Sequence, residues 1–166
     1  MSSRLWNSLW SPGRALLCLT GAWLCLAAAA PQATGTGVTA TAEGFVVIVR
    51  ADNPSSVIDR EALSQIFLKR TTTWPDGVHA EPVDLVSSDA ARAAFTKAVL
   101  RKSMGAVRAF WQQQIYSGRD IPPPEKNSGA EVIAFVAAHP GAVGYVAAAT
   151  SLGDGVKAIS LTEGSP

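Results

Sequence analysis

The stretch at residues 44–52 most constrains how this chain can fold. It reads GFVVIVRAD, a continuous apolar run rich in β-branched side chains, bounded by Gly44 and by Asn53-Pro54. A strand without apolar/polar alternation is buried on both faces, so other elements must cover the sheet on each side of it. The sequence therefore predicts a layered α/β domain built around this strand.

Helical patterns alternate with further short apolar runs along the rest of the chain. Apolar spacing predicts helices over about 59–70, 89–101, 105–116 and 128–138, and strands over 82–86, 142–147 and 156–161. Asp59 is expected to cap the first helix, and Ser128 with Glu131 fits a capping box that opens the last one. Residues 117–126 (SGRDIPPPEK) are expected to form a loop that no helix or strand crosses. The connections are long enough for parallel pairing, which predicts a three-layer α/β fold with a mostly parallel sheet.

The first thirty residues have the pattern of an export signal. Arg4 and Arg14 precede an apolar run over residues 15–30, which is shorter than the ~20 residues of a permanent membrane helix. Both cysteines, Cys18 and Cys25, lie in this run, so the mature chain is expected to hold no disulfide and no thiolate metal site. We expect a cleaved signal peptide at 1–30, a flexible leader at 31–43, one folded domain at 44–161 and a flexible tail at 162–166.

Charge and residue types exclude several classes of function. Removal of Arg4 and Arg14 leaves 14 − 2 = 12 basic residues against 13 acidic ones, a net charge of −1 in place of +1. Such a chain has no basic field for nucleic acid or anionic lipid. His79 and His139 are the only histidines and lack a carboxylate at ligand spacing, so we expect no metal site. No nucleophile elbow or phosphate-binding loop motif occurs, and we expect neither catalysis nor a cofactor.

One polar elbow is the candidate binding site. In VDLVSSDAARAAF, residues 83–95, a short apolar strand runs through two serines and an aspartate into a helix. Free backbone N–H groups and the positive end of the helix dipole at such a junction can hold an anion. The candidate ligand-binding residues are Ser87, Ser88, Asp89 and Arg92, the last through its guanidinium. A second interpretation stays open, in which Asp89 only caps its own helix.

Two motifs resemble the periplasmic phosphate-binding proteins of ABC transporters. IFLKRTTTWPDG, residues 66–77, is similar to their Ile-Phe-Leu-Gly-Lys-x-x-x-Trp-x-Asp-Gly stretch, and HPGAVGYVA, residues 139–147, is similar to their Pro-Gly-x-Ile-Gly-Tyr-Val strand. The resemblance implies a type II periplasmic binding protein-like fold, in which two α/β lobes close on an anion. This chain resembles a single lobe.

The resemblance also has departures that bear on the ligand. Leu85 falls where the family has an arginine, and residues 89–91, Asp-Ala-Ala, fall where it has Ser-Gly-Thr. The hypothesis is an exported, periplasmic, non-enzymatic protein that binds a small phosphate-like anion weakly, with an ABC permease or another envelope protein as partner. A homodimer through an apolar rim around Trp74 and the proline loop is a further option, although Trp74 also fits a loop anchor. The alternative is an envelope-associated or protein-interaction scaffold that has lost ligand binding.

Overall fold

The computed structural model describes residues 44–163 of the 166-residue chain. The expected signal peptide at 1–30 and leader at 31–43 lie outside these residues, as does the end of the expected tail. Within residues 44–163, no helix has both the length and the apolar character needed to cross a membrane.

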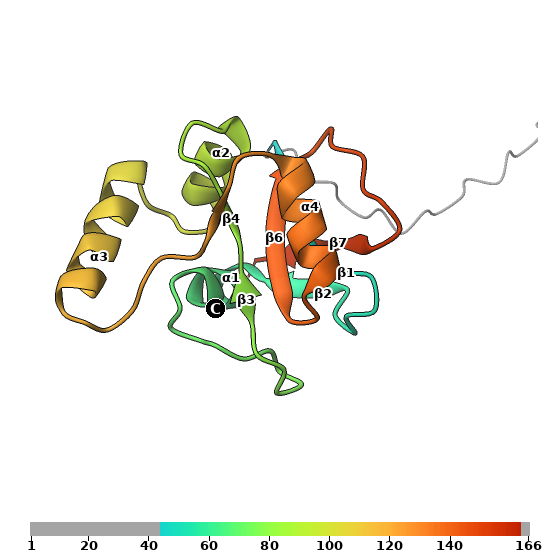
Figure 1. Ribbon diagram of the computed structural model, residues 1–166, viewed down its shortest axis with the longest axis horizontal. Coiled ribbons are helices and arrows are strands. Elements are labelled where there is room, and N and C mark those ends of the chain that lie inside the picture. Colours follow the sequence, from blue (N-terminus) through green and yellow to red (C-terminus); the bar gives the residue numbers. More distant parts are fainter. Residues whose placement is uncertain (1–43, 164–166) are drawn as a thin grey trace, which may run out of the picture. The chain divides into compact units, whose positions relative to one another are not determined.

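A five-stranded sheet forms the centre of the fold, with strand order β2-β7-β1-β6-β3 (Figure 1). Its strands are β1 (Phe45–Arg50), β2 (Val57–Asp59), β3 (Glu81–Pro82), β6 (Ala142–Ala147) and β7 (Val156–Thr162). A separate small sheet pairs β4 (Asp84–Leu85) with β5 (Glu125–Lys126). The helices are α1 (Arg60–Phe67), α2 (Ala90–Ala98), α3 (Met104–Tyr116) and α4 (Gly129–Ala138).

The predicted strand β1 is confirmed as the central strand, but the expected strand directions need correction. β1 runs antiparallel to both of its neighbours, β6 and β7, whereas β2 pairs parallel with β7 and β3 pairs parallel with β6. The sheet is therefore mixed, where we expected mostly parallel pairing. An unbroken apolar run indicates burial on both faces but carries no information on direction, and a long crossover permits parallel pairing without requiring it.

Helices cover both faces of the sheet, which confirms the three-layer architecture. On one face, Phe45 of β1 and Tyr145 of β6 pack with Phe67 of α1 and Phe95 of α2, and the rings of Phe95 and Tyr145 stack 3.9 Å apart. On the other face, Gly144 of β6 lies directly under α4. These contacts place the core between the sheet and its two layers of helices.

Helix caps form where the sequence predicted them. Asp59 accepts hydrogen bonds from the backbone N–H groups of the first turn of α1, and Ser128 accepts one from Glu131 at 3.3 Å. The Glu131 carboxylate in turn accepts the backbone N–H of Asn127 at 3.0 Å, so the predicted box satisfies two donors at the start of α4.

Two short strands, β2 and β5, were not predicted. The prediction that no strand lies within residues 117–126 is wrong at its end, because β5 follows the last proline. There the Lys126 carbonyl accepts the N–H of Val86 at 2.9 Å, and the Pro124 carbonyl accepts the N–H of Asp84 at 3.0 Å. Proline lacks a donor but keeps its acceptor, so a strand can begin at the edge of such a loop.

Trp74 anchors its loop to the fold. Its side chain is buried, and the indole N–H donates to the Gly141 carbonyl at 2.9 Å. This confirms the loop-anchor interpretation and removes Trp74 from the apolar rim expected for a homodimer. Ile121 in the proline loop, in contrast, is 66% exposed.

Candidate functional site

The elbow between β4 and α2 is a tight, capped turn. The Asp89 N–H donates to the Val86 carbonyl at 3.0 Å and closes the turn across Ser87 and Ser88. The Asp89 carboxylate accepts the N–H of Ala91 at 2.8 Å, so this side chain caps α2. The capping interpretation of Asp89 is therefore confirmed, and one of the free donors at the helix start is already occupied.

Arg92 does not extend forward from the helix start, as the anion hypothesis supposed. Its side chain is buried and forms an ion pair with Asp84, the first residue of β4. Its second terminal nitrogen lies 4.0 Å from the carboxylate of Glu125 in β5. Its Nε has no hydrogen-bond partner among residues 44–163. Much of its charge is thus balanced within the protein.

Asp84 is the centre of a buried polar cluster. Besides the ion pair, its carboxylate accepts the hydroxyl of Tyr145 and the backbone N–H of Leu85, the latter at 3.0 Å. Burial raises the pKa of Tyr145 well above its usual value, so the hydroxyl stays protonated and remains a donor even in alkaline solution that would ionise an exposed tyrosine. The Tyr145 side chain is fully buried, so its hydroxyl binds within the core.

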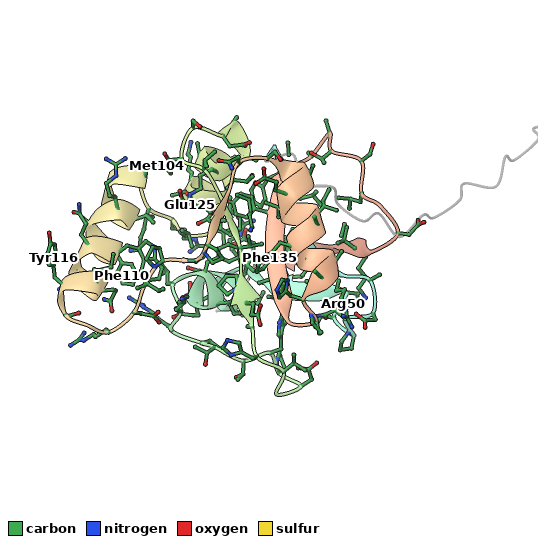
Figure 2. All side chains as sticks on the ribbon, viewed as in Figure 1. Arg50, Met104, Phe110, Tyr116, Glu125 and Phe135 are labelled. Atoms are coloured by element: carbon green, nitrogen blue, oxygen red, sulfur yellow. The ribbon has the colours of Figure 1, made fainter. Side chains whose placement is uncertain are left out.

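A pocket of about 350 Å³ opens beside this cluster, and we call it the elbow pocket. Its walls are the elbow with the first turn of α2, one face of α3, and the end of the proline loop. Figure 2 labels Met104 and Glu125, which belong to two of these walls. The lining residues are Asp84, Ser87, Arg92, Met104, Val107, Arg108, Trp111, Gln112, Ile115, Pro122, Pro123 and Glu125.

The pocket brings together only part of the predicted site. Ser87 and Arg92 line it, whereas Ser88 and Asp89 do not. Arg108 and Gln112 also line the pocket but are not among the predicted site residues, because the apolar spacing of residues 105–116 indicates only the buried side of the helix. A signal was present: the two residues are four apart in a helix, so they share a face beside the buried Val107 and Trp111.

The elbow pocket is lined by equal numbers of positively and negatively charged side chains. Arg92 and Arg108 supply two positive charges, and Asp84 and Glu125 supply two negative ones. Arg108 is exposed and has no ion pair within the described part of the chain. The pocket thus offers one unpaired guanidinium, a serine hydroxyl and an amide to a ligand. No cluster of three or more metal-ligating side chains occurs among residues 44–163.

Comparisons with known proteins place the fold. The model of the PBP superfamily domain matches residues 28–164 of this chain. No curated protein matches the sequence. Among solved structures, a putative phosphate ABC transporter substrate-binding protein with bound phosphate from Clostridium perfringens is similar with a TM-score of 0.56 and 16% identity, over 71% of this chain and 44% of that one.

Two further structures show the same fold. An ABC-type phosphate transport receptor from Vibrio cholerae has a TM-score of 0.54 at 20% identity, over 71% of this chain and 46% of that one. PstS from Borrelia burgdorferi has a TM-score of 0.55 at 16% identity, over 74% and 49%. This chain spans less than half the length of each of the three structures. The single-lobe fold expected from the sequence motifs is therefore confirmed.

Proposed function

This chain belongs to the PBP superfamily, and we propose that it is an exported, periplasmic, non-enzymatic protein that binds a small phosphate-like anion weakly in the elbow pocket. The observation that carries the proposal is the unpaired guanidinium of Arg108, which shares one pocket with Ser87 and Arg92. An exposed guanidinium beside neutral donors can form charge-assisted hydrogen bonds to an oxyanion. The structural relatives named for phosphate transport support an anion as the ligand.

We expect weak binding because the site is open to solvent and because acidic side chains line it beside the basic ones. Sites for small ligands usually bury most of the ligand surface, whereas an anion in one open lobe competes with bulk water for its donors. Asp84 and Glu125 also repel a dianion from the same pocket. A partner that covers the open side, such as an ABC permease, another envelope protein or a second copy, would strengthen binding by excluding that water.

Titration calorimetry of the full chain with phosphate and with sulfate at low ionic strength tests this proposal. Arg108→Gln should weaken binding by about tenfold or more, because a hydrogen bond to a charged group contributes roughly 1.5–3 kcal/mol. Arg119→Gln is the matched control, since Arg119 is also exposed but lies outside the pocket. Equal effects of the two substitutions would contradict the elbow pocket as the site. Arg92 is unsuitable for this test because its removal breaks a buried ion pair.

A scaffold without a ligand is the second candidate function. It is favoured by the buried pairing of Arg92 with Asp84 and by exposed apolar residues at the end of α3 and after it. Ile115 is 51% exposed, Tyr116 is 90% exposed and points away from the rest of the fold (Figure 2), and Ile121 lies nearby in sequence. On this hypothesis, no anion produces heat, and the exposed apolar residues contact a second copy of the chain. The mass measured by light scattering should then fall from that of a dimer to that of a monomer in the double variant Tyr116→Ser/Ile121→Ser.

A further inference from the structure

We infer that the elbow pocket prefers an organic monoanion with an apolar body, such as a short-chain carboxylate, over inorganic phosphate. This inference rests on the function proposed above and names the class of ligand. It follows from three properties of the pocket: the apolar character of half its lining, the balance of its charges, and its volume.

Half of the pocket lining is apolar. α3 contributes a stripe of apolar side chains one turn apart, and the proline loop supplies a facing wall; these residues are Met104, Val107, Trp111, Ile115, Pro122 and Pro123. Inorganic phosphate has no apolar surface, so it would leave this lining in contact with water. An alkyl or aryl body would bury part of it, and the stabilisation grows with the apolar area removed from water.

The charge balance favours a single negative charge on the ligand. The guanidinium of Arg92 is already paired with Asp84, and Glu125 lies 4.0 Å from it. Arg108 is the remaining cation of the pocket, and it can neutralise one negative charge. A second negative charge would face two carboxylates without a cation of its own. Coulomb repulsion therefore disfavours a dianion more than a monoanion.

The volume of the pocket also suits an organic ligand. About 350 Å³ lies at the lower end of the range of roughly 300–1,000 Å³ that is usual for sites of organic ligands. Inorganic phosphate would fill a small part of this space. We expect the ligand carboxylate at Arg108 and Gln112, which share one face of α3, and the ligand body against Trp111 and the prolines.

A series of linear carboxylates tests the inference on the full chain. Calorimetry would compare acetate, butyrate and hexanoate with inorganic phosphate and with hexanamide, which has the length of hexanoate but no charge. Affinity should rise about threefold to fourfold with each added methylene, as expected for burial of that group. Hexanamide should bind at least tenfold more weakly than hexanoate, because it cannot pair with Arg108.

Variants separate this site from non-specific adsorption of the alkyl chain. Ile115→Ser should flatten the dependence on chain length, because Ile115 is an exposed apolar residue of the pocket. Val78→Ser is the matched control, since Val78 is also exposed and apolar but does not line the pocket. Arg108→Gln should bring hexanoate down to the affinity of hexanamide.

The outcomes distinguish this inference from the proposed function. Phosphate binding tighter than hexanoate, with no trend along the series, would overturn the preference for an organic ligand and leave anion binding in place. Absence of heat with every anion would overturn both and favour the scaffold. A chain-length trend that Val78→Ser reduces as much as Ile115→Ser would also overturn the inference.

Discussion

Arg92 and Asp84 form an ion pair inside the fold, with each side chain only 6% exposed. Removal of one partner leaves the other charge buried without compensation, which typically costs about 3–5 kcal/mol. Arg92→Met should therefore lower the free energy of unfolding by that amount in urea titrations. Asp52→Asn is the control, because Asp52 pairs with Arg50 in an exposed position and its loss should change the stability much less. Similar effects of the two substitutions would show that the Arg92 pair is solvated.

Tyr145 should make the protein sensitive to alkaline pH. Burial raises its pKa in the folded state, whereas the unfolded chain ionises near the ordinary value of about 10. The folded state then binds more protons, so stability is complete below about pH 10 and falls as the pH rises above it. Tyr145→Phe should be less stable at pH 8, because Asp84 loses a donor, but its stability should fall less between pH 8 and pH 11.

Urea unfolding at the two pH values measures this difference. Tyr116→Phe provides the matched control, since it removes the other tyrosine of the chain, which is almost fully exposed. That variant should follow the wild type at both pH values. If the free energy of unfolding falls equally between pH 8 and pH 11 in Tyr145→Phe and in the wild type, the role assigned to the buried hydroxyl is refuted.

Gly144 permits the close approach of α4 to the sheet. A Cβ at this position would lie 2.6 Å from a methyl carbon of Val132 and 2.9 Å from one of Val83. Because both neighbours are stiff β-branched residues, Gly144→Ala should overpack this layer and cost about 1–3 kcal/mol. Gly153→Ala, where a Cβ meets nothing within 4 Å, is the control. Thermal unfolding of the two variants measures this cost. An unchanged melting temperature in Gly144→Ala would mean that α4 can shift to make room for the added methyl group.

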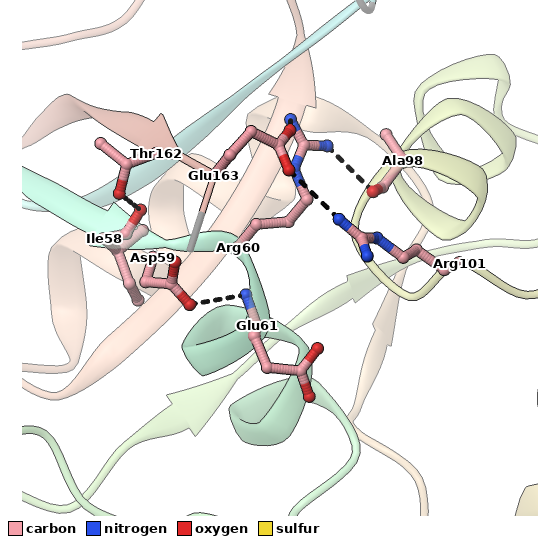
Figure 3. A network of polar contacts seen from close by, with 8 residues as sticks. All are labelled: Ile58, Asp59, Arg60, Glu61, Ala98, Arg101, Thr162 and Glu163. Atoms are coloured by element: carbon pink, nitrogen blue, oxygen red, sulfur yellow. Dashed lines mark hydrogen bonds and ion pairs between the residues drawn. The ribbon is translucent and has the colours of Figure 1, made fainter. Parts of the chain in front are cut away.

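Glu163 joins the end of the sheet to the start of α1 and to the segment that follows α2. Its carboxylate pairs with Arg60 at 2.8 Å and with Arg101 at 3.1 Å, while Arg60 also donates to the Ala98 carbonyl at 2.9 Å (Figure 3). Glu163→Gln should lower the free energy of unfolding by about 0.2–1 kcal/mol, as expected for partly exposed pairs. The difference should shrink at high salt, where such pairs are screened. Asp154→Asn, another exposed carboxylate, should show neither effect.

Much of the fold could be predicted because the apolar patterns and helix caps in the sequence mark the segments that are buried and the starts of helices in the structure. The unbroken apolar run of β1 indicated a central strand, and the caps at Asp59 and Ser128 located two helix starts. The direction of β1 could not be predicted, since both of its partners lie about a hundred residues away in sequence. β2 and β5 have three and two residues, too few for a hydrophobic period to show.

The candidate site was less accessible to sequence reasoning than the fold. Ser87 and Arg92 do line the elbow pocket, but the partner of Arg92 could not be identified. Asp84 lies eight positions earlier and meets Arg92 only because β4 and α2 pack together. Arg108 and Gln112 were hidden because a helix with Val107 and Trp111 on one side is usually read as core. Residue types can suggest donors, but only tertiary structure shows which of them are already paired.

The position of β1 also determines when this fold can form. β1 begins at Phe45, yet both strands that flank it, β6 and β7, begin at Ala142 and Val156. Contacts this distant in sequence require closure of long loops and slow the search for the native state. A chain emerging from the ribosome therefore cannot complete its sheet until β7, at residues 156–162, has been synthesised. Until then β1, the most apolar strand of the domain, has two open edges. The growing chain therefore remains unfolded, and its unpaired strand can associate with other chains and aggregate.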